Sequence, residues 1–302
     1  MERRGRRTIL LIGLAAAGMA AAAEPPLRAA RWLAAGRDPV AALAFEPTEC
    51  LAPTPDPLVE VGRAAFRTPL LLGGQAARAG LSCASCHRGG RDNPDFAFPG
   101  LSGAPGTADV TSSLMSRTRG DGVANPKSIP SLVGAATIDR MPGARTLENF
   151  VHGLVFEEFD GAEPPPRVLA GLTAYVRALR PAACPAEARR AVSVAHDLDA
   201  ATRAVRAADA AFAAGDRAAG RLLVAAARSE LGGIDERYAG LARSQRRLDA
   251  ADRALAAVVG APDPRPQLAA WLADAPRWSR VLRRAERRSL YDRRRLAAAF
   301  GR

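Results

Sequence analysis

Two cysteines and a histidine stand close together in the stretch SCASCHRGG, residues 82–90. Cys83, Cys86 and His87 fit the C-x-x-C-H pattern of covalent haem attachment. Two thiols about one helical turn apart can reach the two vinyl groups on one edge of a porphyrin, and the adjacent histidine then comes up beneath the iron. The motif therefore predicts one haem c, attached by thioethers to Cys83 and Cys86, with His87 as the proximal axial ligand.

Two other kinds of site also use closely spaced cysteines. A structural zinc site needs a second pair of ligands, whereas the chain offers only three histidines and two distant cysteines besides the motif. A redox C-x-x-C motif is typical of a thioredoxin-like α/β context, and no strand pattern of any length is evident in the sequence. Haem c therefore remains the interpretation that the residues favour.

The sixth ligand of the iron would decide what such a haem does. Downstream candidates are Met115, Met141 and His152, and an open or water-ligated iron is the other alternative. We expect Met141, because it lies in a proline-bounded loop before a predicted helix; Met115 suits core filling, and His152 lies inside that helix. A thioether favours ferrous iron, so His/Met ligation raises the reduction potential and suits electron transfer.

Residues 1–23 have the plan of a secretory signal peptide. Four arginines (residues 3, 4, 6 and 7) precede an apolar run of about 16 residues, shorter than the roughly 20 that span a bilayer. A cut after Ala23 would follow small residues. The adjacent arginines 6 and 7 also suit twin-arginine export, but that route carries folded cargo, whereas haem is attached outside the cytoplasm to a largely unfolded chain. We expect general secretion to the periplasm.

Cys50 and Cys184 are left over once the motif cysteines are assigned to haem. In an oxidising compartment they should be paired, and they flank the expected haem domain. A disulfide between them would close a loop of about 135 residues, which the loop-entropy model values at up to about 4–5 kcal/mol. Two separate buried thiols are the alternative; we predict the disulfide.

The elements that must position the motif all have helical patterning, so the predicted fold class is all-α. A lead-in segment at 24–49 precedes a cytochrome c-like haem domain at 50–185, and an Ala/Arg-rich α-helical bundle or hairpin domain follows at 186–302. Within the haem domain, helices are expected over three segments on either side of a Gly- and Pro-rich loop: 58–66, 146–159 and 167–180. In the last domain, helix ends are expected at Gly215, at Gly232–Gly233 and from Gly260 to Pro266.

The formal net charge is +12, and 42 of the 43 basic residues are arginine. That bias is typical of a GC-rich genome, and export argues against nucleic acid as a partner. The charge favours acidic proteins or anionic lipid as partners, with strong salt dependence. Residues 277–302 carry ten arginines, with Trp271, Trp278 and Tyr291 nearby or interspersed, so this end could make peripheral membrane contact. A solvated basic helix face is the alternative.

Two segments resemble one haem domain of the bacterial di-haem cytochrome c peroxidase and MauG family. The first runs from VGRAAF (61–66) to SCASCH (82–87), and the second is IPSLVGAATIDRMPGARTLENFV (129–151). The resemblance covers roughly residues 57–180 and implies a mono-haem cytochrome c fold with His87 and Met141 as axial ligands. The family's enzymes carry two haem motifs, whereas residues 186–302 contain no cysteine, so peroxidase activity does not follow from the resemblance.

These patterns favour a periplasmic cytochrome that exchanges electrons with a redox partner protein, and the net charge of +12 suits an acidic one. The competing hypothesis is a peroxidase-like oxidoreductase, which needs an open sixth site and an acid/base group above the iron. Glu157 and Glu158 are candidates for that group, although both suit solvated charges at the end of a helix.

Overall fold

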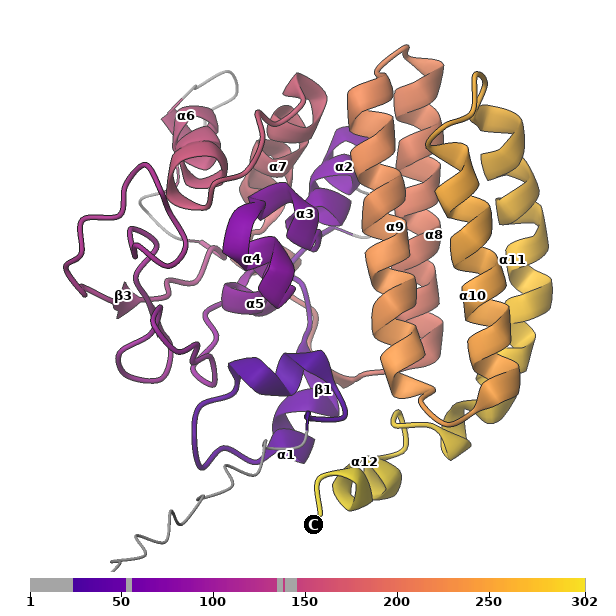
Figure 1. Ribbon diagram of the computed structural model, residues 1–302, viewed down its shortest axis with the longest axis horizontal. Helices are drawn as coiled ribbons and strands as arrows, with labels where there is room; N and C mark the ends of the chain where they lie inside the picture. Colours follow the sequence, from indigo (N-terminus) through magenta and orange to yellow (C-terminus); the bar gives the residue numbers. More distant parts are fainter. Residues whose placement is uncertain (1–23, 53–55, 135–137, 139–145, 302) are drawn as a thin grey trace, which may run out of the picture.

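The computed structural model describes residues 24–52, 56–134, 138 and 146–301 of the chain (Figure 1). The protein is 58% helix and 5% strand, which agrees with the all-α class expected from the sequence. Short helices and a long loop make up one half, and long antiparallel helices make up the other. No helix among the described residues is both long and apolar enough to cross a membrane.

The half that contains the C-x-x-C-H motif consists of short elements around one apolar cluster, which extends into the bundle. The helix expected before the motif and the last helix of this half lie within a residue or two of their predicted bounds. The elements are α2 (Pro57–Phe66), α3 (Pro69–Leu72), α4 (Gly74–Ala79), α5 (Cys83–Cys86), the 3₁₀ turn η2 (Arg88–Gly90), β2 (Thr107–Ala108), β3 (Lys127–Ser128), α6 (Thr146–Gly153), the π-helical turn η3 (Leu154–Glu158) and α7 (Pro166–Ala178).

The second half is a bundle in which four long helices run alternately up and down (Figure 1). Apolar residues three or four positions apart in α8, among them Leu198, Val205 and Phe212, are all buried, as an amphipathic helix requires. The elements are α8 (Val194–Ala213), α9 (Arg217–Arg237), α10 (Ala242–Val258), α11 (Arg265–Ala285), the 3₁₀ turn η5 (Glu286–Arg288) and α12 (Arg293–Ala299).

The expected helix end at Gly232–Gly233 is wrong, because α9 continues through both glycines. Each glycine costs a helix roughly 1 kcal/mol relative to alanine. On either side, however, Leu231 and Ile234 are 1% and 0% exposed, so burial of these two side chains outweighs the local propensity.

The lead-in segment contacts both halves of the molecule. Its elements are η1 (Arg28–Trp32), α1 (Pro39–Leu43) and β1 (Phe45–Pro47), and β1 pairs antiparallel with β4 (Arg189–Ala191). Leu43 belongs to a small apolar cluster that includes Leu296 of α12. The sequence showed no strands because each of these ladders spans only two or three residues, too few for an alternating pattern.

Helix α2 links the two halves, since it packs against α7 on one side and against α8 and α9 on another. A Cβ atom at Gly62 would lie 1.9 Å from the carbonyl oxygen of Gly171, so glycine at this crossing allows the two backbones to touch. Towards the bundle, Arg67 donates from Nε to Glu230 of α9 at 2.6 Å. That carboxylate raises the pKa of Arg67 further above its ordinary value.

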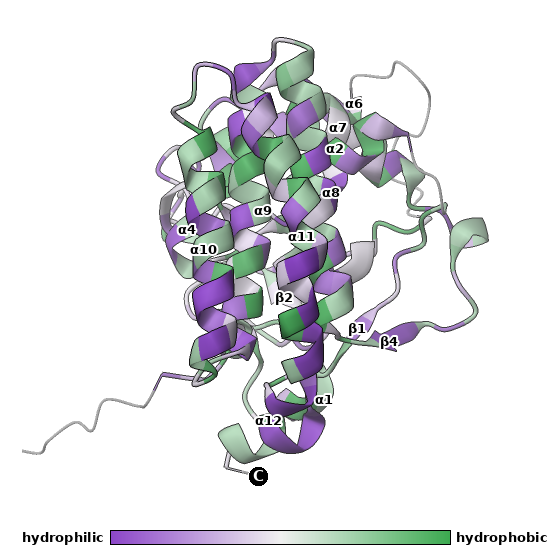
Figure 2. Ribbon diagram, turned by 90° about the vertical axis from the view of Figure 1, so that its right-hand side faces the viewer, coloured by the Kyte–Doolittle hydropathy of each residue, from purple (hydrophilic) through white to green (hydrophobic). Residues whose placement is uncertain are grey.

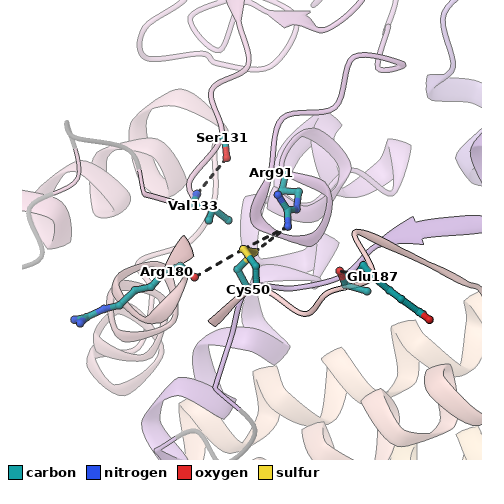
Figure 3. The surroundings of a disulfide bond; sticks show 8 residues. Cys50, Arg91, Ser131, Val133, Arg180 and Glu187 are labelled. Atoms are coloured by element: carbon teal, nitrogen blue, oxygen red, sulfur yellow. Dashed lines mark hydrogen bonds between the residues drawn. A yellow bond between two sulfur atoms is a disulfide. The ribbon is translucent and has the colours of Figure 1, made fainter. Parts of the chain in front are cut away.

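The predicted disulfide between Cys50 and Cys184 is confirmed, with the two residues 134 positions apart (Figure 3). Arg91, four residues after the motif histidine, donates from Nη2 to the Cys50 sulfur at 2.9 Å. The Arg180 amide donates to the Cys50 carbonyl at 3.0 Å. The disulfide therefore joins the two ends of the haem-motif half beside the motif itself.

We expect the double variant Cys50→Ala/Cys184→Ala to unfold with a free energy lower by up to about 4 kcal/mol, because its unfolded chain regains the entropy of a long loop. Urea unfolding followed by circular dichroism measures this difference. Wild-type protein unfolded with a reductant should match the variant. Equal stability of the oxidised wild type and the variant would contradict the prediction.

Candidate haem site

The motif cysteines form a single helical turn, α5, whose ends are fixed by side chains. Ser82 and Ser85 make a reciprocal capping box, in which the Ser82 amide donates to the Ser85 hydroxyl at 3.1 Å. The buried Asn93 donates from Nδ2 to the Ser85 carbonyl at 2.8 Å. The His87 amide closes the turn onto the Cys83 carbonyl at 2.8 Å.

The helical turn α5 has two faces, one that carries the motif side chains and one that lines a cavity. At about 100° per residue, Cys83, Cys86 and His87 fall on one side of the helix, so all three can address one planar ligand. The other side, formed by Ala84, Ser85 and Arg88, lines a cavity of about 280 Å³ shared with the lead-in segment and α9. The cavity thus lies behind the motif, away from the face that carries the thiols and the imidazole.

His87 is oriented for a ligand at its Nε2 atom. Its Nδ1 lies 3.0 Å from the carbonyl oxygen of Pro130, which can only accept a hydrogen bond, so Nδ1 carries the proton. Burial lowers the pKa of His87 to about 4, against the opposing effect of that hydrogen bond, so the ring is neutral at pH 7. A neutral imidazole held through Nδ1–H presents the Nε2 lone pair, as metal-binding histidines do.

The two thiols are poor nucleophiles in this fold. Loss of hydration raises the pKa of Cys83 to about 12, and that of Cys86 to about 12 as well, although both side chains remain partly accessible. A redox-active C-x-x-C site depends on a lowered thiol pKa, so these surroundings do not suit thiol–disulfide exchange. The cysteines do not pair with each other.

The segment after the motif turns sharply at two glycines with positive φ. A Cβ at Gly89 would lie 2.8 Å from the Pro47 carbonyl oxygen, and one at Gly90 would lie 2.5 Å from a methyl of Leu179. The Gly90 carbonyl accepts from the Leu132 amide at 2.9 Å. Because the backbone passes so closely, the segment 130–132 of the long loop is held beside His87.

Two aromatic side chains lie near the ring of His87. The Phe66 ring lies 6.4 Å from that of His87 and 5.1 Å from that of Tyr175, measured between ring centroids. The Tyr175 hydroxyl donates to Glu49 at 3.0 Å, and Glu49 is also paired with Arg63. Helices α2 and α7 thus place two aromatic side chains next to the imidazole, and the hydroxyl group of Tyr175 is hydrogen-bonded.

The candidate sixth ligands have different surroundings. Met141, the expected one, lies outside the described residues. Met115 is 1% exposed and belongs to the main apolar cluster. His152 has its Nε2 within 3.0 Å and 2.9 Å of the two carboxylate oxygens of Glu163 and stacks on Phe156. To bind iron, His152 would have to give up that carboxylate.

The two candidate acid/base groups also differ. Glu157 is paired with Arg119, whose Nε lies 2.7 Å from a carboxylate oxygen. Glu158, in the π-helical turn, is half-buried, and its Oε2 has no hydrogen-bond partner among the described residues. Burial raises the pKa of Glu158 above its ordinary value. The expectation of a solvated charge therefore fits Glu157 better than Glu158.

Sequence reasoning did not identify Pro130, Asn93 or Arg91 as parts of the site. Pro130 acts through its carbonyl oxygen, Asn93 holds a backbone carbonyl, and Arg91 contacts the disulfide. The residue types alone do not reveal these roles. A signal existed for Pro130, because it lies in the IPSLVG segment on which the family resemblance rests.

The chain has no match among family models, curated proteins or solved structures. Among the described residues, no three histidine, cysteine, aspartate or glutamate side chains cluster as a metal site. The residues around α5 nevertheless fit haem c: two thiols and a neutral, oriented imidazole share one face of a single turn beside an apolar cluster.

Proposed function

We propose that this protein is a mono-haem c-type cytochrome that exchanges electrons with a partner redox protein in the periplasm. Cys83 and Cys86 would carry the thioether bonds, Nε2 of His87 would be the proximal ligand, and Met141 would supply the sixth ligand. When bound, the haem supplies one-electron redox chemistry. The haem-motif half is accordingly a cytochrome c-like domain, similar to one haem domain of the di-haem peroxidase and MauG family.

The hydrogen bond from His87 Nδ1–H to the Pro130 carbonyl carries this proposal. A C-x-x-C-H sequence can occur by chance, but a half-buried neutral imidazole whose Nδ1 is committed to a carbonyl presents its Nε2 lone pair to a ligand. The bond also joins two segments 43 residues apart, so it is a tertiary feature that the motif alone does not produce. Both segments belong to the stretches that resemble the family.

The test is to express the chain together with the cytochrome c maturation machinery and to purify it from the periplasm. We expect a red protein with a single covalent haem, seen as a mass increase of one haem per chain and a pyridine haemochrome spectrum of the c type. A colourless protein that is exported and folded would disprove the proposal. Circular dichroism of the helices establishes folding independently of colour.

Glu158 keeps a second function open, a peroxidase-like oxidoreductase. Burial raises the pKa of this half-buried carboxyl, and Glu158 lies in a π-helical turn, a feature frequent at functional sites. The spectrum of the oxidised protein separates the two functions. A low-spin haem with a weak far-red band from sulfur ligation supports electron transfer, and a high-spin haem that consumes peroxide supports the peroxidase.

A further inference from the structure

The positive charge of the chain is concentrated at its C-terminal end. Residues 24–241 contain 24 basic and 24 acidic residues and have no net charge, whereas residues 242–301 contain fourteen arginines and six acidic residues, a net charge of +8. A genomic preference for arginine acts on the whole chain. It explains why the basic residues are arginine, but it does not explain why the unbalanced charge collects in one segment.

The six acidic side chains of this segment are already engaged. Each is held by an ion pair or by hydrogen bonds from backbone amides, and after all six are counted the segment keeps its net charge of +8. The partners are Arg253 for Asp249, Arg228 for Asp252, the Arg265 amide for Asp263, Arg277 for Asp274, the Val194 amide for Glu286, and the amides of Arg294 and Arg295 for Asp292.

Nine exposed arginines of the segment have no acidic partner among the described residues; we call them the basic face. They lie at the start of α10, along the second half of α11 and in the turn and helix that follow. The members are Arg243, Arg246, Arg247, Arg280, Arg283, Arg284, Arg287, Arg288 and Arg294. On α11, Arg280 and Arg284 lie opposite the buried Leu282 and Trp278.

These elements meet at one end of the bundle, because α10 runs away from that end and α11 returns to it (Figure 1). Figure 2 shows hydrophilic residues concentrated on the lower parts of α10 and α11. An open hollow of about 730 Å³ lies between α1 and the segment from η5 to α12, lined among others by Arg287, Arg293 and Arg294. The nine arginines therefore lie on elements that meet at one end of the bundle.

The aromatic residues of this segment do not belong to that surface. Trp271, Trp278 and Tyr291 are only 5%, 7% and 8% exposed, which corrects the expectation that they could take part in docking. Among the large apolar side chains exposed in the described residues, only Val259 lies in this segment, near the opposite end of α10. Protein–protein interfaces are built around an apolar or aromatic core, and this surface has none.

The part of the basic face on α10 and α11 lies across the bundle from the motif, whereas α12 lies beside the lead-in segment, where Arg293 stacks over the Phe45 ring. Helices α8 and α9 stand between α5 on one side and α10 and α11 on the other (Figure 1). A redox partner docked on α10 and α11 would therefore be separated from His87 by a layer of helices. The absence of an apolar core in this surface is what argues against a protein partner.

We infer that the basic face binds an anionic phospholipid surface and holds the protein there. Arginine binds phosphate oxygens through two parallel N–H donors. Attachment without apolar anchors depends on charge alone, so it is reversed by salt. The inference does not depend on whether haem is bound.

The test measures co-sedimentation of the protein with vesicles in 50 mM and 500 mM NaCl. Vesicles of phosphatidylcholine containing about 40% phosphatidylglycerol are compared with vesicles of phosphatidylcholine alone. Each arginine near an anionic surface strengthens binding roughly fivefold. The triple variant Arg280→Gln/Arg284→Gln/Arg288→Gln should therefore bind about one hundredfold more weakly than the wild type at low salt.

The matched control is Arg180→Gln/Arg206→Gln/Arg221→Gln. These three arginines are exposed, have no acidic partner among the described residues and lie outside the basic face. The control variant has the same net charge as the test variant, and we expect it to bind as the wild type does. Circular dichroism and thermal unfolding verify that both variants are folded.

Three outcomes would overturn the inference. The first is equal loss of binding in the two variants, which would indicate an effect of net charge alone. The second is binding that survives 500 mM NaCl and the triple variant, which would assign attachment to the apolar run near residues 8–23. The third is a preference for soluble polyglutamate over anionic vesicles in a competition assay, which would assign the surface to an acidic polypeptide.

Discussion

The variant Cys83→Ala/Cys86→Ala is expected to contain no covalent haem. After expression with the maturation machinery, it should give no haem stain on a denaturing gel and lose all colour on extraction with acidic acetone, whereas the wild type retains its colour. Only thioether bonds survive these treatments. No other cysteine can replace the two, because Cys50 and Cys184 are joined to each other.

The chain supplies its own matched control, the variant Cys50→Ala/Cys184→Ala. It also removes two cysteines, but it leaves the motif turn and His87 unchanged, so the haem stain should persist while the stability falls. If the motif variant keeps a haem stain, or if only the disulfide variant loses it, the assignment of the two cysteine pairs is wrong. The two readouts, cofactor and stability, therefore respond to different pairs.

Features that depend on neighbouring residues were predictable from the sequence. The apolar spacing of residues 58–66 and 167–180 predicted α2 and α7, because burial of one face stabilises each helix. The pairing of Cys50 with Cys184 followed from an even number of cysteines and from their positions around one domain. Each of these inferences requires only local patterning or counting.

Apart from the disulfide, features that depend on how distant segments pack against one another were not predictable. The Pro130 carbonyl meets His87 only because the chain turns at Gly89 and Gly90 and the long loop returns to α5. Burial of Leu231 and Ile234 carries α9 through two glycines that locally favour an end. The burial of Trp278 likewise depends on how α11 packs in the bundle, so the sequence could not separate it from the exposed arginines.

The charge asymmetry shows how the two kinds of information combine. The net charge of +8 in residues 242–301 is a property of the sequence alone. Only the structure reveals that the acidic residues there form ion pairs and helix caps, and that the aromatic residues are buried. The basic face becomes a specific hypothesis only when both facts are known.

The substitution Met141→Ala is expected to convert a low-spin haem into a high-spin one. The oxidised protein should lose its weak far-red absorption band, because that band requires sulfur ligation. Its reduction potential should fall by on the order of a few tenths of a volt, within the roughly 0.8 V that axial ligation spans. Absorption spectroscopy, electron paramagnetic resonance and a redox titration measure the three changes.

Met115→Leu is the control for this substitution. Met115 is buried in the apolar cluster, and leucine preserves its volume, so we expect a small loss of stability and an unchanged spectrum. Loss of the far-red band in Met115→Leu with its retention in Met141→Ala would exchange the roles of the two methionines. His152→Gln, which removes only the partner of Glu163, should leave the spectrum unchanged as well.

The same measurement decides between carrier and catalyst. If the wild type is already high-spin and consumes peroxide, its sixth position is open, and Glu158 becomes the candidate acid because burial raises the pKa of its carboxyl. In that case Glu158→Gln should slow peroxide consumption while leaving the haem stain unchanged. If the wild type is low-spin and only Met141→Ala reacts with peroxide, the methionine is what keeps the iron from substrate, and electron transfer is the function of the native site.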